Sequence, residues 1–200
     1  MLEKPLVLAS SSPYRRALLA RLGLPFTTAS PDIDETPNPG ESSEGLAQRL
    51  AVGKARALSE SYPDHWIIGS DQVAELPDGS RLAKPGTYPR AYQQLVKSSG
   101  QRVTFHTGLA LIDTSTARIE SLSEPFYVSF RNLTEIEIEH YLKTETPYDC
   151  AGSFKMEGLG IALFTEFSGR DPNCLVGLPL IALNDLFRAW GLNPLTVTPS

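Results

Sequence analysis

Leu6-Val7-Leu8-Ala9-Ser10-Ser11-Ser12-Pro13-Tyr14-Arg15-Arg16 is the stretch of this 200-residue chain that decides its fold. Its four apolar residues indicate a short buried strand, and the amphipathic segment from Ala17 to Leu22 indicates a helix. Pro13 suits the first helical position, with Ser12 as the expected N-cap and Gly23 as the stop. Hydroxyl groups, backbone N–H groups and guanidinium groups all donate hydrogen bonds at such a junction, so the stretch predicts an anion site. An ordinary capped helix with solvated arginines is the alternative that this stretch alone leaves open.

The composition indicates a globular protein that binds small ligands. The chain is 41% hydrophobic and 20% charged, which is enough for one domain or two closely joined lobes, and we expect residues 1–200 to form a single domain. A net charge of -5 argues against a protein that coats a nucleic-acid polymer. The two cysteines and three histidines show no metal-ligand spacing. Without a secretory pattern or an apolar run near the ~20 residues that span a membrane, we expect a cytoplasmic protein.

The rest of the sequence alternates short strands with helices and then continues in longer strands. We expect strands at 25–29, 66–69, 102–112, 118–131 and 161–164, and helices from Ser43, over 87–99, after the capping box of Thr134 and Glu137, and over 179–190. Long antiparallel strands after strand–helix units indicate a mixed sheet. The strand at 66–69 is expected to end at Ser70-Asp71-Gln72, and a carboxylate just past a central strand is a common functional location.

The polar residues in these loops and strand ends suit a bound polyphosphate. The donors are Ser10, Arg15, Arg16, Lys54 and Lys84, and the carboxylates are Glu35 and Asp71. Mg²⁺ commonly shares one or two carboxylates with substrate phosphates, while lysine and arginine offset the remaining charge. Each residue alone has a commoner explanation, because a lone helix lysine is usually solvated and an aspartate after a strand is often a cap.

Several motifs in this order resemble the Maf family of nucleotide pyrophosphatases over almost the whole chain. They are Leu8-Ala9-Ser10-x-Ser12-Pro13-x-Arg15-Arg16, Asp34-Glu35, Lys54, Gly69-x-Asp71, Lys84-Pro85, Gly152-x-Phe154 and Gly177-Leu178-Pro179. The resemblance implies an α/β fold of mixed α+β type, with the elongated mixed sheet of the inosine-triphosphatase kind, flanking helices, and two lobes around a central cleft. It also implies a possible homodimer that hydrolyses nucleoside triphosphates to monophosphate and pyrophosphate with a divalent metal, Mg²⁺, Mn²⁺ or Co²⁺.

The resemblance implies a role for each polar residue. Those that bind the triphosphate would be Ser10, Arg15, Arg16, Lys54 and Lys84. Glu35 would help to hold the metal, and Asp71 would be the general base toward water. Asp71 could instead be mainly a metal ligand, because a carboxylate beside a metal-bound water can orient it, deprotonate it or anchor the ion.

Three residues depart from the family members that act on thymidine and uridine triphosphates, namely Tyr14, Gln72 and Glu157. Together they resemble the branch that cleaves 7-methylguanosine triphosphate. A carboxylate at Glu157 can accept from both N1–H and the 2-amino group of guanine. Methylation at N7 makes the base cationic, which favours an aromatic face such as that of Tyr14. The alternatives are structural roles, in which Tyr14 packs on its own helix, Glu157 pairs with Lys155 or Arg170, and Gln72 caps a turn.

Two other functions stay open from the sequence. One is a pyrophosphatase of the same family that acts on dTTP and UTP or broadly on modified nucleotides. The other is a non-catalytic nucleotide-binding regulator of cell division. Asp71 and Glu35 argue against the second, because a sensor has no need of a water-activating carboxylate beside phosphates.

Overall fold

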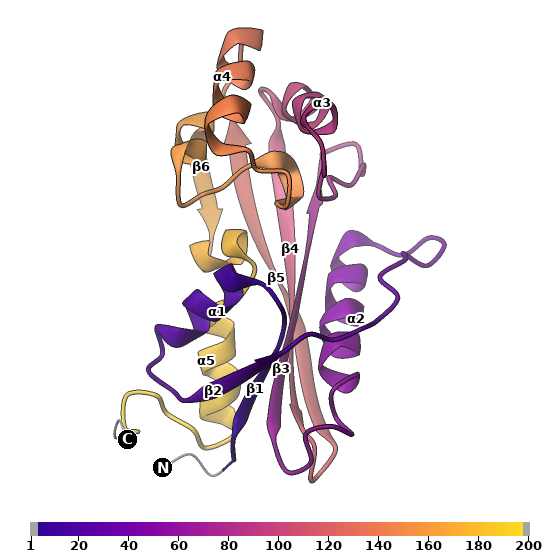
Figure 1. Cartoon of the computed structure of the whole chain (residues 1–200), viewed down its shortest axis with the longest axis vertical. Helices are drawn as coiled ribbons and strands as arrows, with labels where there is room; N and C mark the ends of the chain where they lie inside the picture. Colours follow the sequence, from indigo (N-terminus) through magenta and orange to yellow (C-terminus); the bar gives the residue numbers. More distant parts are fainter. Residues whose placement is uncertain (1–3, 198–200) are drawn as a thin grey trace.

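The computed structural model describes residues 4–197, and within this range the chain forms one mixed sheet in the order β2-β1-β3-β4-β5-β6 (Figure 1). The strands are β1 (Leu6–Ala9), β2 (Phe26–Ala29), β3 (Trp66–Glu75), β4 (Arg102–Asp113), β5 (Arg118–Phe130) and β6 (Phe164–Gly169). The helices are α1 (Pro13–Ala20), α2 (Ser43–Arg56), α3 (Tyr88–Ser98), α4 (Glu135–Glu145) and α5 (Leu180–Ala189), with short 3₁₀ turns η1 (Ala151–Ser153), η2 (Leu159–Leu163) and η3 (Pro172–Val176). The expected mixed α/β fold is confirmed.

The first half of the sheet is parallel and the second half is antiparallel. Strand β1 pairs in parallel with both β2 and β3, and the remaining neighbours pair antiparallel. Helix α1 connects β1 to β2, whereas α2 connects β2 to β3 on the opposite face of the sheet (Figure 1). Because side chains alternate along a strand, Leu6 and Leu8 pack toward α1 and α5, while Val7 and Ala9 pack toward α2. Strand β1 is therefore buried on both sides.

Strands β4 and β5 are long enough to serve both ends of the molecule. At about 3.3 Å per residue a strand of this length spans roughly 40 Å. Leu109 and Leu111 on β4 belong to the core beneath α5, whereas Val103 and Phe105 belong to a second core under α3, α4 and η1. The two cores give the elongated shape seen in Figure 1.

The boundaries of most elements match the sequence expectations, and Ser12 caps α1 by accepting from the backbone N–H of Arg15. Two expectations were wrong. The strand expected to end at 69 continues to Glu75, because β4 keeps pairing with it after its parallel pairing with β1 stops at Gly69. The strand expected at 161–164 is the 3₁₀ turn η2, and β6 begins only at Phe164.

Among residues 4–197 the structure has no helix with the length and apolar character that crossing a membrane requires.

Candidate functional site

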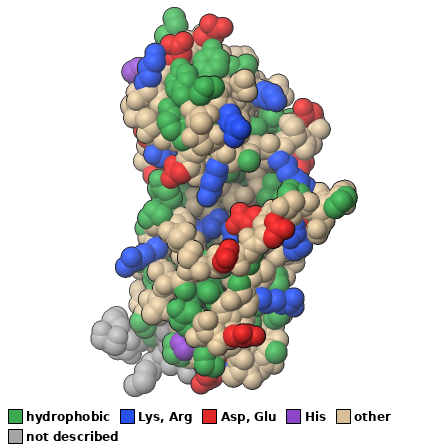
Figure 2. All heavy atoms as spheres, turned by 45° about the vertical axis from the view of Figure 1, so that its right-hand side comes forward, with side chains coloured by type: hydrophobic (Ala, Val, Ile, Leu, Met, Phe, Trp, Pro, Cys, Tyr) green, Lys and Arg blue, Asp and Glu red, His purple; other side chains and the backbone are tan. Residues whose placement is uncertain are grey.

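A cavity of about 540 Å³ opens near the middle of the long axis, between the two cores. Figure 2 shows the hollow on this face, with Lys, Arg, Asp and Glu side chains around it. The walls come from the start of α1, from α2, from the middle of β3, from the segment 81–84 and from the loop 149–157. A smaller cavity of about 290 Å³ adjoins it around the turn from Ser10 to Arg15. Segments far apart in the sequence thus meet at one site.

A buried ion cluster stands at one end of the larger cavity. The Nζ of Lys54 lies 2.5 Å from Oδ1 of Asp71 and 2.7 Å from Oε1 of Glu35. Lys54 and Asp71 are both buried, whereas the Glu35 side chain is 58% exposed. Burial raises the pKa of Glu35, but the hydrogen bond and charge of Lys54 and the charge of Lys84 outweigh it, so this pKa lies below its ordinary value. The cluster holds two carboxylates around one cation.

Two glycines allow Lys54 to reach Asp71. A Cβ on Gly69 would lie 2.0 Å from the carbonyl oxygen of Ala51, and a Cβ on Gly108 would lie 2.0 Å from that of Ala47. The backbone of α2 therefore lies directly against β3 and β4. At this distance the lysine on α2 meets the aspartate on β3, which is paired with Gly108.

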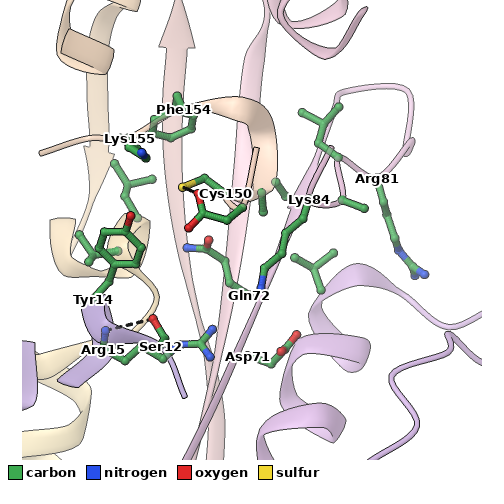
Figure 3. Close-up of a pocket in the computed structure, with 18 of the residues that line it drawn as sticks. Ser12, Tyr14, Arg15, Asp71, Gln72, Arg81, Lys84, Cys150, Phe154 and Lys155 are labelled. Carbon is green, nitrogen blue, oxygen red and sulfur yellow. Dashed lines mark hydrogen bonds between the residues drawn. The ribbon is translucent and has the colours of Figure 1, made fainter. Parts of the chain in front are cut away.

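Arg15 lies at the same end of the cavity as Asp71 (Figure 3), where the segment before α5 fixes it. Its Nε donates to the carbonyl of Gly177 at 2.7 Å, and the hydroxyl of Ser70 donates to the same oxygen at 2.8 Å. Gly177 has a φ of 101°, a conformation that favours glycine. Burial lowers the pKa of Arg15, and the charges of Asp71 and Glu35 oppose that shift. The arginine thus faces the ion cluster.

The remaining predicted phosphate ligands do not all reach the cavities. Ser10 is buried in the smaller cavity, and its Oγ accepts from the backbone N–H of Ser12 at 3.1 Å. Lys84 is exposed and lines both cavities. Arg16 is also exposed, but among the described residues it lines neither cavity. The structure therefore brings Ser10 and Lys84 to the site and leaves Arg16 outside it.

The three predicted specificity residues all line the larger cavity. Figure 3 shows Tyr14 across the cavity from Lys84. Burial raises the pKa of Tyr14, and the charges of Asp149 and Glu157 raise it further. The amide nitrogen of Gln72 donates to the carbonyl of Cys174, so part of the Gln72 side chain is already engaged. This part of the cavity carries an aromatic ring, two carboxylates and the side chain of Lys155.

The partners proposed for Glu157 as alternatives bind elsewhere. Lys155 donates from Nζ to the backbone carbonyl of Glu145 at 3.0 Å. Arg170 pairs with Glu124 and Asp185. Glu157 is exposed, and among residues 4–197 it takes part in no ion pair. Its carboxylate remains available to a ligand.

Sequence reasoning missed Asp149, which lines both cavities, and Ser70, which shares the Gly177 carbonyl with Arg15. Asp149 stands directly before the glycine-containing segment that begins at Cys150, and its position there was the only available signal. No sequence pattern pointed to Ser70, because its acceptor, the Gly177 carbonyl, lies more than 100 residues away in the sequence.

The carboxylates fit a metal that is shared with phosphate oxygens. In the part of the chain that the structure describes, no group of three or more His, Cys, Asp and Glu side chains could hold an ion by itself. Asp71 and Glu35 nevertheless lie close together, because both contact Nζ of Lys54. Mg²⁺ is typically bound through one or two carboxylates together with substrate phosphates, and this donor set matches that mode.

The chain is similar to several known proteins. A family model described as Maf-like protein matches residues 5–190. Two curated relatives carry the name 7-methyl-GTP pyrophosphatase. The one from Pseudomonas syringae pv. tomato is 57% identical over 94% of this chain and 97% of its own length, and the one from Chromohalobacter salexigens is 57% identical over 95% and 98%. Among solved structures, the Ham1 protein of Staphylococcus aureus is 13% identical, covers 64% of this chain and 73% of its own, and gives a TM-score of 0.46.

Proposed function

Because the chain belongs to the family of Maf-like proteins, we propose that it is a cytoplasmic enzyme that hydrolyses 7-methyl-GTP to 7-methyl-GMP and pyrophosphate. The names of two relatives at 57% identity support this substrate. The observation that carries the proposal is the arrangement of one cavity. Arg15 and Asp71 lie at one end, Lys155 of the loop that carries Glu157 lies at the other, and Tyr14 lies between them (Figure 3).

The cationic end suits a triphosphate. Attack at the α-phosphorus places negative charge on the non-bridging and leaving oxygens, so fixed cations stabilise the transition state more than the ground state. Lys54, Arg15 and Lys84 supply these cations, and the buried hydroxyl of Ser10 supplies a hydrogen bond. Arg15 is fixed in advance by the Gly177 carbonyl, which limits the entropy lost on binding.

Asp71 is positioned to act on the attacking water. Its Oδ1 accepts from Lys54, which leaves Oδ2 to take a proton. The carboxylate is buried in the cavity wall, which shields it from bulk solvent. We assign it the role of general base.

Glu35 and Asp71 would hold the divalent metal, for which we propose Mg²⁺, Mn²⁺ or Co²⁺. When bound, such an ion offsets phosphate charge in the transition state. Lys54, which bridges the two carboxylates, also sets how much negative charge they present to the ion.

The other end suits a cationic purine. The ring of Tyr14 offers a face for cation–π stacking, and Glu157 offers two acceptors to the N1–H and 2-amino groups of guanine. Asp149 adds a second carboxylate beside Tyr14. Uracil and thymine present a single donor on the corresponding edge and carry no positive charge, so they gain less from these groups.

Product analysis tests the reaction. Incubation with 7-methyl-GTP and Mg²⁺ is expected to release 7-methyl-GMP and pyrophosphate in equal amounts. The variant Asp71→Asn should lower kcat by about 10²- to 10⁴-fold, the usual contribution of a general base. It should also lower the melting temperature, because the buried Lys54 loses the charge of one of its two carboxylate partners. Release of orthophosphate and a diphosphate would contradict the reaction, and binding without any turnover would favour the non-catalytic regulator. The homodimer implied by the family resemblance stays a prediction, which sedimentation can check.

A further inference from the structure

The loop that carries Glu157 is attached to the end of a helix outside the cavity. Helix α4 ends at Glu145, and the chain then turns through Thr146, whose φ is 45°. The segment from Lys155 to Leu159 returns across this helix end before it enters η2. Figure 3 shows Lys155 on the loop at the upper edge of the cavity.

Three hydrogen bonds join this loop to α4. The carboxylate oxygen Oε1 of Glu145 accepts from the backbone N–H of Leu159 at 2.7 Å. The backbone carbonyl of Glu145 accepts from Nζ of Lys155 at 3.0 Å. The hydroxyl of Tyr141, a buried residue of α4, accepts from the backbone N–H of Lys155 at 3.0 Å. The bonds flank Glu157 on both sides, while its own side chain is bound by no ion pair among residues 4–197.

Gly158 allows the Glu145 carboxylate to contact the loop backbone. A Cβ on Gly158 would lie 2.5 Å from Oε1 and 2.8 Å from Oε2 of Glu145, so the carboxylate rests directly on the loop backbone. This contact with Glu145 leaves no room for a side chain at Gly158 unless the carboxylate moves. The Glu145 side chain therefore has one specific place to bind.

We propose that Glu145 is a positioning residue for base selection, which holds the 155–159 loop so that the Glu157 carboxylate faces the bound base. This inference rests on the proposed function, because it assigns Glu157 to the base. Glu145 itself does not line the cavity within the described residues, so it acts through the loop. The position of the Glu145 carboxylate thus determines how well the Glu157 carboxylate discriminates between nucleotides.

The test measures the ratio of kcat/KM for 7-methyl-GTP to that for GTP and for UTP. Glu145→Ala should lower the ratio to UTP by roughly threefold to tenfold, the effect of losing one well-placed hydrogen bond. It should lower the ratio to GTP less, because GTP presents the same N1–H and 2-amino donors and lacks only the positive charge. Glu145→Gln keeps an oxygen that can accept from Leu159 and should restore most of each ratio. Gly158→Ala displaces the same carboxylate from the loop side and should reproduce the loss. The control is Glu139→Gln, an exposed α4 residue that pairs only with Lys143, which should change neither ratio.

The double variant Glu145→Ala/Glu157→Gln separates positioning from general stability. If Glu145 acts through Glu157, this variant should show the same ratios as Glu157→Gln alone. Additive losses, or an equal fall in kcat/KM for all three nucleotides, would overturn the positioning role. Failure of the wild-type protein to cleave 7-methyl-GTP would overturn the proposed function together with this inference. A normal wild-type ratio that falls in Glu157→Gln but stays constant in Glu145→Ala and Gly158→Ala would overturn the inference alone.

Discussion

Lys54 both stabilises the folded protein and is proposed to bind phosphate. In the free protein its ammonium group compensates the buried carboxylate of Asp71 and the partly exposed carboxylate of Glu35. Breaking a buried pair by removing one partner costs about 3–5 kcal/mol, because the other charge is left uncompensated. A cation held in this way is already ordered when a triphosphate arrives. The same side chain thus stabilises the empty site and contributes to phosphate binding.

Base selection is the property that single residues should control. The double variant Tyr14→Arg/Glu157→Gln should lower the preference for 7-methyl-GTP over UTP, because it removes the aromatic face and one acceptor charge. Cation–π stacking alone accounts for about 0.5–2 kcal/mol, or up to roughly thirtyfold. Rates on the two nucleotides measured side by side check this, with Glu166→Gln on β6 as an exposed control outside the cavity. Unchanged relative rates would show that these positions do not read the base.

At the residue scale, the sequence predicts best those roles that depend on near neighbours. The Ser12 cap follows from the three residues after it, and the family motifs pointed to Lys54 and Asp71. The sequence could not predict that Arg15 is fixed by Gly177 or that Gln72 is engaged by Cys174, because these partners are 162 and 102 residues apart. Only the fold brings them together.

Helix α2 is the element that builds the site. Its close approach to the sheet depends on Gly69 and Gly108. This approach brings Lys54 within hydrogen-bonding distance of Asp71. The burial pattern of α2 and its capping by Ser42 follow from local sequence. The distance between α2 and the sheet does not follow from local sequence, because it depends on Gly69 and Gly108, which lie in strands that meet only in the folded protein.

Gly69→Ala tests this arrangement. The added methyl group would meet the Ala51 carbonyl, so the helix must move, and we expect a loss of about 1–3 kcal/mol in the free energy of unfolding, as is usual for overpacking. Because Lys54 moves with the helix, kcat/KM should fall as well. Gly53→Ala is the control, since its Cβ would lie 3.4 Å from Ile33 and alanine favours a helix interior, by up to about 1 kcal/mol over glycine. Urea unfolding and a rate assay measure both effects. Normal stability and activity in Gly69→Ala would contradict the close-approach argument.

Two elements show the limits of periodicity. The apolar run at 66–69 indicated a strand. The strand continues to Glu75 because it pairs with β4, and the residues of β3 alone do not reveal this pairing. The apolar residues at 161–163 form a 3₁₀ turn, because the segment after Gly158 turns back on itself before β6 begins. Asp71 consequently lies within a strand, beside the point where the parallel pairing ends.

At the scale of the whole molecule, β4 and β5 connect two cores and leave the cavity between them (Figure 1). Where the triphosphate is proposed to bind, the cavity holds Lys54 and Arg15 together with Asp71 and Glu35. Where the base is proposed to bind, it holds Tyr14, Asp149 and Glu157 together with Lys155. The sequence indicated the two lobes through its family resemblance, but the polarity of the cavity emerges only when residues from both lobes are placed.

The end of the molecule remote from α3 and α4 contains an acid-sensitive group. Burial raises the pKa of Asp113, but hydrogen bonds from Lys4, Ser115 and Trp66 outweigh it, so the pKa lies well below its ordinary value. Because a depressed carboxyl pKa stabilises the fold above the unfolded pKa of about 4, this contribution should fall as the pH drops below that value. Asp113→Asn should be less stable than wild type at pH 7, and the difference should narrow toward pH 3 in urea unfolding.

Asp64→Asn provides the matched control for this effect, since the Asp64 side chain is 75% exposed and lies 3.4 Å from the same lysine. An exposed pair of this kind contributes about 0–1 kcal/mol. A stability difference between Asp113→Asn and wild type that stays constant from pH 7 to pH 3 would contradict the assignment.

The central claim is that the cavity selects a cationic purine nucleotide for hydrolysis. The most direct test is the kcat/KM of the wild-type protein for 7-methyl-GTP, GTP, UTP and dTTP, measured by pyrophosphate release with Mg²⁺ or Mn²⁺. The arrangement of Tyr14 and Glu157 predicts the highest value for 7-methyl-GTP, a lower one for GTP and the lowest for the two pyrimidine nucleotides. Equal values for UTP and 7-methyl-GTP would contradict it.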